Sequence, residues 1–141
     1  MSIGIILITH SGIGRELLKT AINTFEELPL DVIHLPVNQN VTIEYLVGRA
    51  RNLMNKFSHK DGILILTDMY GATPHNIAAK LAPFPIPVKM ITGLNLPMLI
   101  RVLNYPKLNL PDLAWKALSG GREGVLDSST CWQPPISQAQ S

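Results

Sequence analysis

Two short apolar runs, each leading to a polar residue, most constrain how this chain can fold. The first extends from Ile3 to Ile8 and leads to His10, and the second extends from Ile63 to Thr67 and leads to Asp68. Nearly every residue in both runs is bulky and apolar. Runs of this length without alternation are typical of strands that are covered on both faces within a parallel sheet. We therefore expect both polar residues at strand ends.

The rest of the chain predicts two more strands and five helices. Apolar stretches from Leu30 to Pro36 and from Val88 to Ile91 indicate the strands. Helical spacing and proline or glycine boundaries place the helices at about Leu17 to Phe25, Val41 to Phe57, Thr73 to Leu81, Pro97 to Leu103 and Pro111 to Ser119, with Gly120-Gly121 expected to end the last one. Such alternation needs right-handed crossovers. It predicts an α/β fold, a single domain with a mainly parallel four-stranded sheet and helices on both faces.

Composition limits the size and class of the protein. The 141 residues, 46% of them hydrophobic, suffice for one well-packed domain, expected at 1–126, and the Ser-, Gln- and Pro-rich residues 127–141 are expected to form a loosely ordered tail. With 12 basic and 10 acidic residues, the chain has no charge pattern for binding nucleic acid. No apolar stretch approaches the roughly 18 residues of a spanning helix. We expect no membrane insertion and a cytoplasmic location.

Cysteine and histidine spacing gives no sign of a metal site. Cys131 is the single cysteine, which excludes an intrachain disulfide framework and a cysteine-rich metal centre. The four histidines, at positions 10, 34, 59 and 75, lack metal-ligand spacing. His34 and His59 are interpreted as surface or core residues. His75 could instead face a functional site, because it follows the loop after the second apolar run.

The segment from Asp68 to Asn76 combines a strand end, a loop of small residues and a helix start. Thr73 is expected to cap this helix, with Pro74 at its first position. Backbone N–H groups at such a helix start can hold a phosphoryl group. The alternative is that Asp68 and Thr73 only turn and cap the backbone, as these residue types often do.

His10 gives the segment a chemical partner. The first and third strands are neighbours in the commonest arrangements of this architecture, so Asp68 is expected beside His10. A carboxylate that accepts a hydrogen bond from one ring nitrogen leaves a lone pair on the other, which can attack phosphorus. The alternative is a histidine that is satisfied by backbone groups in a turn. No Gly-Lys-Thr phosphate loop and no Gly-x-Ser-x-Gly elbow occurs in the chain.

Four segments of the chain form a specific pattern by their order and placement: Thr9 to Gly12, Asp68 to Asn76, Gly93 to Leu99 and Gly121 to Val125. Through these segments, from about Ile3 to Val125, the chain resembles the IIA domain of the mannose class of the bacterial phosphoenolpyruvate-dependent sugar phosphotransferase system. The related IIA-like domain of the dihydroxyacetone kinase phosphotransfer subunit shares the initial histidine. The Gly93 to Leu99 segment favours the mannose class.

The resemblance implies a phosphotransferase that works through a phosphohistidine. His10 would accept the phosphoryl group from the phosphocarrier protein HPr, and Asp68 would orient the ring. Ser11 and the turn of Gly71, Ala72 and Thr73 would border the phosphate, with no metal or cofactor required. The family turn more often reads Gly-Gly-Ser-Pro-Phe, so this chain departs from it at its alanine and at His75.

The resemblance also implies partners. Transporter members are often followed by a linker and a IIB domain, whereas this sequence ends at residue 141, so we expect a stand-alone phosphocarrier that passes the group to a separate IIB protein. One alternative is a regulatory protein whose His10 phosphorylation state is read by a non-transport partner. Another is a small-ligand-binding module without phosphorylation. We also expect a homodimer in which the segment from Gly124 to Leu126 adds a strand to the sheet edge of the neighbouring subunit.

Overall fold

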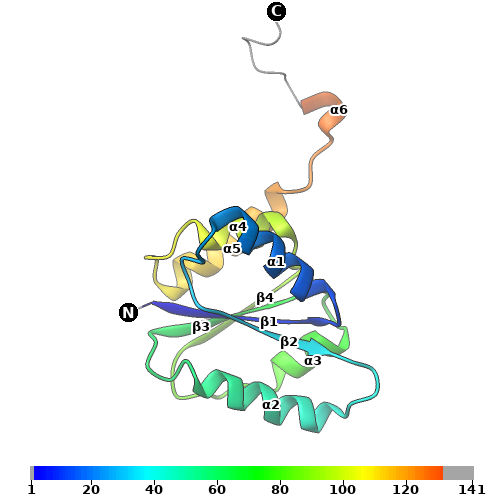
Figure 1. Cartoon of the computed structure of the whole chain (residues 1–141), viewed down its shortest axis with the longest axis vertical. Helices are drawn as coiled ribbons and strands as arrows, with labels where there is room; N and C mark the ends of the chain where they lie inside the picture. Colours follow the sequence, from blue (N-terminus) through cyan, green and yellow to red (C-terminus); the bar gives the residue numbers. More distant parts are fainter. Residues whose placement is uncertain (1, 132–141) are drawn as a thin grey trace, which may run out of the picture.

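A computed structural model describes residues 2–131 and shows a four-stranded parallel sheet in the order β2-β1-β3-β4 (Figure 1). The strands are β1 (Ile3–His10), β2 (Val32–Val37), β3 (Gly62–Thr67) and β4 (Val88–Thr92). The helices are α1 (Ile13–Phe25), α2 (Ile43–Asn55), α3 (Thr73–Ala79), α4 (Leu96–Leu103), α5 (Leu110–Glu123) and α6 (Ser128–Cys131). The predicted α/β fold is confirmed.

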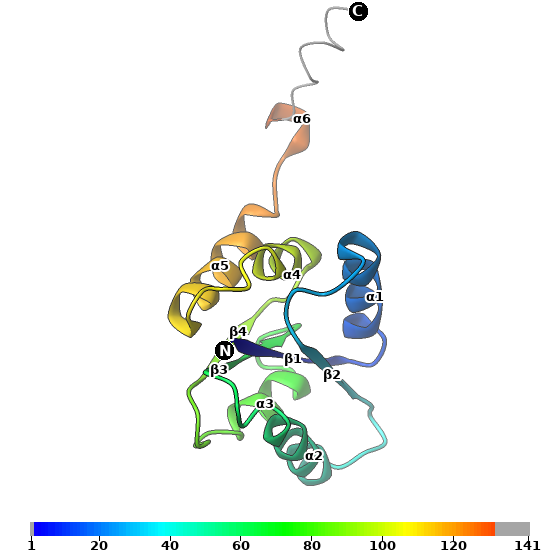
Figure 2. The ribbon, with the colours of Figure 1, turned by 60° about the vertical axis from the view of Figure 1, so that its left-hand side comes forward.

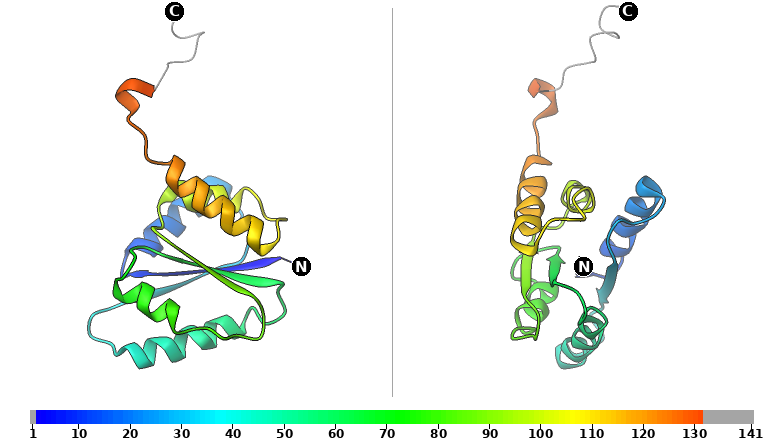
Figure 3. Two further views of the ribbon diagram at one scale, coloured as in Figure 1. Left: turned by 180° about the vertical axis from the view of Figure 1, so that it is seen from behind. Right: turned by 90° about the vertical axis from the view of Figure 1, so that its left-hand side faces the viewer.

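Helices cover the sheet on both faces. Helices α1, α4 and α5 lie on one face and helices α2 and α3 on the other (Figure 2). The view along the strands shows these three layers most directly (Figure 3). Alternate residues of β1 point to opposite faces, so Ile5 and Leu7 pack in the first hydrophobic cluster and Ile6 and Ile8 in the second.

Burial explains why β1 forms the middle of the fold. Ile5, Ile6, Leu7 and Ile8 are all fully buried. Burying a side chain of this size stabilises a fold by about 1.5–3 kcal/mol. Strands β2 and β3 flank β1 on its two edges, and helices cover both of its faces. Neither face of β1 meets solvent, so both can be apolar.

Strand register brings the two polar residues to the same edge of the sheet. β1 pairs with β3 in parallel, and Ile8 lies opposite Thr67. His10 is the last residue of β1, and Asp68 follows β3 directly. Both residues therefore project from the carboxyl ends of adjacent strands, where open parallel sheets bind their ligands.

The prediction that Gly120-Gly121 ends the fifth helix is wrong, because α5 continues through both glycines to Glu123. A Cβ at position 120 would lie 2.6 Å from Arg101 Cβ, and one at position 121 would lie 2.7 Å from Met98 Cε. The two glycines thus let α5 pack closely against α4. Their small size serves helix packing here, although each costs about 1 kcal/mol in helix propensity relative to alanine.

The segment that was predicted to exchange is exposed. Val125 and Leu126 form no strand with the rest of residues 2–131, and their exposed fractions are 76% and 68%. The next element, α6, is a single short helix within the predicted tail, and residues 132–141 of that tail lie outside the described residues. Strand exchange between subunits stays a prediction. Within residues 2–131, no helix combines the length and the apolar character needed to cross a bilayer.

Candidate functional site

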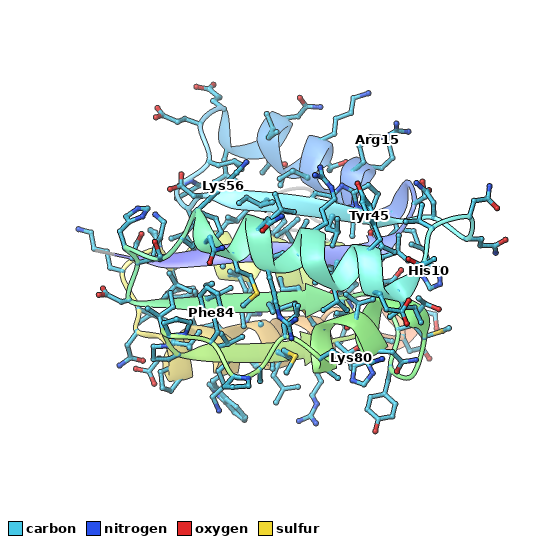
Figure 4. The ribbon with its side chains drawn as sticks, turned by 90° about the horizontal axis from the view of Figure 1, so that it is seen from below. His10, Arg15, Tyr45, Lys56, Lys80 and Phe84 are labelled. Atoms are coloured by element: carbon cyan, nitrogen blue, oxygen red, sulfur yellow. The ribbon has the colours of Figure 1, made fainter. Side chains whose placement is uncertain are left out.

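His10 and Asp68 meet at the carboxyl edge of the sheet. His10 Nδ1 lies 2.7 Å from Asp68 Oδ2, and the backbone N–H of His10 donates to the same oxygen at 2.9 Å. The carboxylate is almost buried, with 7% of its side chain exposed, whereas 45% of the imidazole is exposed. Figure 4 shows His10 at one end of the sheet, beside the start of α2. The pairing of these two side chains was predicted from the sequence.

The contact fixes the chemistry of the ring. An ionised carboxylate can only accept a hydrogen bond, so Nδ1 carries the ring proton and donates a hydrogen bond to Asp68 Oδ2. The neutral ring then keeps its lone pair on Nε2. Within residues 2–131, Nε2 takes part in no hydrogen bond. Asp68 Oδ1 is buried without a hydrogen-bond partner among these residues. The carboxylate is thus placed to stabilise positive charge that develops on the imidazole.

The loop after Asp68 differs in detail from its prediction. Thr73 does not cap α3; it is the first helical residue, and Ala72 holds the cap position in an extended conformation with no side-chain cap. The reason is that Ala72 supplies the carbonyl for the first helical bond, which it accepts from the N–H of Asn76 at 3.0 Å. The hydroxyl of Thr73 is therefore left without a capping bond. Thr73 is exposed to solvent at this edge.

Three backbone N–H groups near His10 already donate to other groups in the fold. Ser11 N–H donates to Val37 O at 3.2 Å and Ala72 N–H to Met69 O at 3.3 Å. Gly71, whose φ of +80° favours glycine, donates its N–H to His75 Nδ1 at 3.3 Å. The exposed hydroxyls of Ser11 and Thr73 are therefore freer to meet a phosphoryl group than these three amides.

Two hollows adjoin His10 and bring in residues that sequence reasoning missed. One, of about 320 Å³, is lined by His10, Thr73 and the β2–α2 loop, including Asn38 and Gln39. The other, of about 550 Å³, brings Ser11 together with His10 and the same loop. Gly71 and Ala72 do not line either hollow, and neither does His75. This loop could have been predicted from the pairing of β2 with β1, because that pairing places Val37, the last residue of β2, opposite His10.

His75 has a local structural contact. Its ring centroid lies 4.6 Å from that of Tyr70, and its Nδ1 accepts the Gly71 N–H. Asn76, from the same helix, donates its side-chain N–H to Gly71 O at 3.4 Å. The first turn of α3 thus holds the loop that follows Asp68.

His34 is a half-buried histidine on β2, close to the site. Its Nε2 lies 3.1 Å from Thr9 Oγ1. Burial, with a further contribution from the positive charge of Arg15, lowers the pKa of His34 below 6.5. Arg15 itself lies on α1, where its Nε pairs with Glu16 at 3.4 Å.

This lowered pKa predicts a pH effect on stability. The unfolded chain binds a proton on His34 more readily than the folded chain, so stability is complete above about pH 6.5 and falls as the pH drops toward the lowered pKa. Urea unfolding at several pH values should therefore show that the free energy of unfolding declines more steeply with acid in the wild type than in His34→Gln. Parallel pH profiles for the two proteins would contradict the prediction.

Comparison with known proteins places the chain in a family. Residues 4–110 match the family model described as the PTS system fructose IIA component. The chain belongs to this family.

The chain is also similar to individual members of the sugar phosphotransferase system. It is 30% identical over 128 residues to the mannose-specific EIIAB component of Escherichia coli K12, a match that covers 89% of the chain and 39% of the relative. It is also 30% identical over 84 residues to the fructose-specific EIIA component of Bacillus subtilis, with 59% of the chain and 58% of the relative covered. The chain thus spans about two fifths of the length of the mannose-specific relative.

Solved IIA structures share the fold. Phosphotransferase system component EIIA from Streptococcus agalactiae is 25% identical, with a TM-score of 0.74, and the match covers 92% of this chain and 99% of that one. The mannose/sorbose-specific IIA subunit from Enterococcus faecalis has a TM-score of 0.77 at 22% identity, over 96% and 99% of the two chains. At that identity the second match supports the fold alone.

Proposed function

We propose that this IIA protein is a phosphocarrier of a sugar phosphotransferase system, which accepts a phosphoryl group from phosphorylated HPr on His10 and passes it to a IIB protein. One observation carries the proposal. The imidazole is held through Nδ1 by a nearly buried carboxylate, and Nε2 is left with a lone pair at the open edge of the sheet. Membership in the IIA family supports the same role.

The reaction we propose is an in-line transfer through a phosphohistidine. The lone pair of His10 Nε2 attacks phosphorus, and the bond between phosphorus and the donor breaks with its electron pair going to the donor. Positive charge develops on the imidazole, and Asp68 stabilises it through the Nδ1–H hydrogen bond. The next acceptor attacks the same phosphorus, so His10 regains its lone pair. Positioning and electrostatics supply the catalysis.

The phosphoryl oxygens need donors beside Nε2. We assign this role to Ser11 and Thr73, whose side chains line the hollows next to His10. Gly71 and Ala72 would join only if their N–H groups left His75 and Met69, to which they now donate. The mechanism uses no metal, and residues 2–131 contain no cluster of three or more metal-ligating side chains.

The proposed function is tested by incubating the full chain with phosphoenolpyruvate, enzyme I and HPr. Acid-labile phosphate should appear on the chain only when all three are present. Adding a IIB protein should then discharge it. Phosphorylation without discharge would favour the regulatory alternative, and absence of phosphorylation would refute the phosphocarrier role.

We also propose that the domain extends to residue 126 and that the protein forms a homodimer. In this dimer, the segment from Gly124 to Leu126 adds a strand to the sheet edge of the partner subunit. The edge strand β4 has no neighbour on its outer side within residues 2–131, and Met90 on it is 39% exposed. Val125 and Leu126 are exposed apolar residues that a partner's sheet edge could bury.

Truncation before Gly124 should weaken the dimer. We expect light scattering at tens of micromolar to show a dimer for the full chain and a monomer for the truncated one. A chain that lacks only residues 132–141 is the matched control and should remain dimeric. A monomeric full chain would refute the dimer, whereas a dimer that survives the longer truncation would refute strand exchange alone.

A further inference from the structure

Thr9, which precedes His10, has a fully buried hydroxyl with three polar neighbours. Thr9 Oγ1 lies 2.9 Å from His10 O and 2.9 Å from the N–H of Gly14, which donates to it. His34 Nε2 is the third neighbour, at 3.1 Å. The mechanism above uses none of these contacts.

The hydrogen-bonding capacity of a hydroxyl decides the direction of each bond. Thr9 has one proton and two lone pairs. Its proton goes to the His10 carbonyl, which can only accept, and one lone pair accepts from Gly14. The remaining lone pair can accept only from an N–H, so His34 carries a proton on Nε2. With that assignment, every bonding position of the buried hydroxyl is satisfied.

This arrangement joins three elements beneath the site. His34 lies opposite Leu7 in the β1–β2 pairing, which places its side chain on the α1 face of the sheet, the same face as that of Thr9. Gly14 is the second residue of α1, and the cap residue Gly12 has no side chain to bond the helix start. Thr9 therefore replaces the missing helix cap from the preceding strand.

Gly14 leaves the space that the contact needs. A Cβ at this position would lie 2.5 Å from His34 Nε2 and 2.7 Å from Thr9 Oγ1. Distances this short would force His34 away from Thr9. The imidazole of His34 thus occupies space that a side chain at position 14 would fill.

We propose that His34 is a positioning residue for His10, acting through the hydroxyl of Thr9. His34 holds that hydroxyl in the orientation that bonds both the His10 carbonyl and the first turn of α1. Asp68 fixes His10 through its N–H and ring, and Thr9 fixes the same residue through its carbonyl. The effect on phosphoryl transfer rests on the proposed function, whereas the contact itself does not.

The kinetic test compares His34→Leu, which removes the donor, with His34→Gln, which keeps an N–H donor on a side chain of similar reach. We expect His34→Leu to lower the maximal rate of phosphorylation by about 3- to 10-fold, the loss typical of one hydrogen bond. The KM for phosphorylated HPr should not change, because His34 lines neither of the hollows beside His10. His34→Gln should restore most of the rate.

A second pair of variants tests whether His34 acts through Thr9. Thr9→Val removes the hydroxyl, and Thr9→Ser retains it as the matched control. We expect Thr9→Val to slow transfer at least as much as His34→Leu, because it removes all three contacts of the hydroxyl, and the double variant to be no slower than Thr9→Val alone. Multiplied effects in the double variant would overturn the proposal, and so would a wild-type rate in His34→Leu. If His34→Leu fails to fold, a wild-type rate in Thr9→Val, or a rate in His34→Gln as low as that of Thr9→Val, would overturn the proposal.

A spectroscopic test needs no phosphorylation. In NMR spectra of the unphosphorylated chain, the Gly14 amide and the His10 carbonyl carbon should shift in His34→Leu and keep nearly wild-type positions in His34→Gln. Unshifted signals in His34→Leu would overturn the positioning role. If the wild type accepts no phosphoryl group, the proposed function fails, and these signals still decide whether His34 holds the His10 turn.

Discussion

Replacing His10 by alanine is expected to abolish phosphorylation of the chain by phosphoenolpyruvate, enzyme I and HPr. His10 Nε2 is the nitrogen at the sheet edge whose ring is oriented by a carboxylate, and alanine supplies no nucleophile. The measurement is acid-labile phosphate bound to the purified variant. The loss should be complete, since no neighbouring group substitutes for the attacking lone pair.

Two other histidines serve as controls for this result. His59 lies exposed between α2 and β3, away from the site, so His59→Gln should be phosphorylated like the wild type. His75→Ala should still accept phosphate, although its contact with Gly71 is lost. Phosphate that persists at wild-type level in His10→Ala would overturn the assignment and make His75 the first residue to examine.

Replacing Asp68 by asparagine is expected to slow phosphoryl transfer by about two to four powers of ten, the range seen when a catalytic imidazole loses its partner carboxylate. The amide can still accept the His10 N–H, so the turn should persist, but it cannot balance charge on the ring. Stopped-flow or quench-flow phosphorylation would measure the rate. Urea unfolding should show a change in stability within about 1 kcal/mol.

Asp61→Asn provides a matched control for the same chemical change. Asp61 is exposed and precedes β3, whereas Asp68 follows that strand at its other end. Its variant should transfer phosphate at the wild-type rate. If Asp68→Asn also kept that rate, Asp68 would only turn the backbone, which is the alternative that its residue type suggests.

The fold could be predicted because its signals are local and agree with one another. Apolar runs without alternation predicted β1 and β3 as strands covered on both faces. Because these two strands were expected to be neighbours, His10 was predicted to lie beside Asp68, although 58 positions separate the two residues in the chain. The pairing needed no side-chain detail, because the carboxyl ends of adjacent parallel strands meet by geometry alone.

The details that escaped prediction depend on contacts between distant segments. The pair Gly120-Gly121 resembles a helix stop until α4 is packed against it. Thr73 resembles a cap until the carbonyl of Ala72 takes the first helical bond. His34 was interpreted as a surface or core residue, because its contact with Thr9 is visible only once β2 is paired with β1.

A single oxygen, Asp68 Oδ2, binds both the main-chain nitrogen and the ring nitrogen of His10. Together the two hydrogen bonds restrict rotation of the His10 side chain about its χ1 and χ2 angles. The conformational entropy of this side chain is therefore lost during folding and not during the encounter with a donor. Because the ring is already ordered both when His10 accepts the phosphoryl group and when it passes the group on, this ordering should speed both steps.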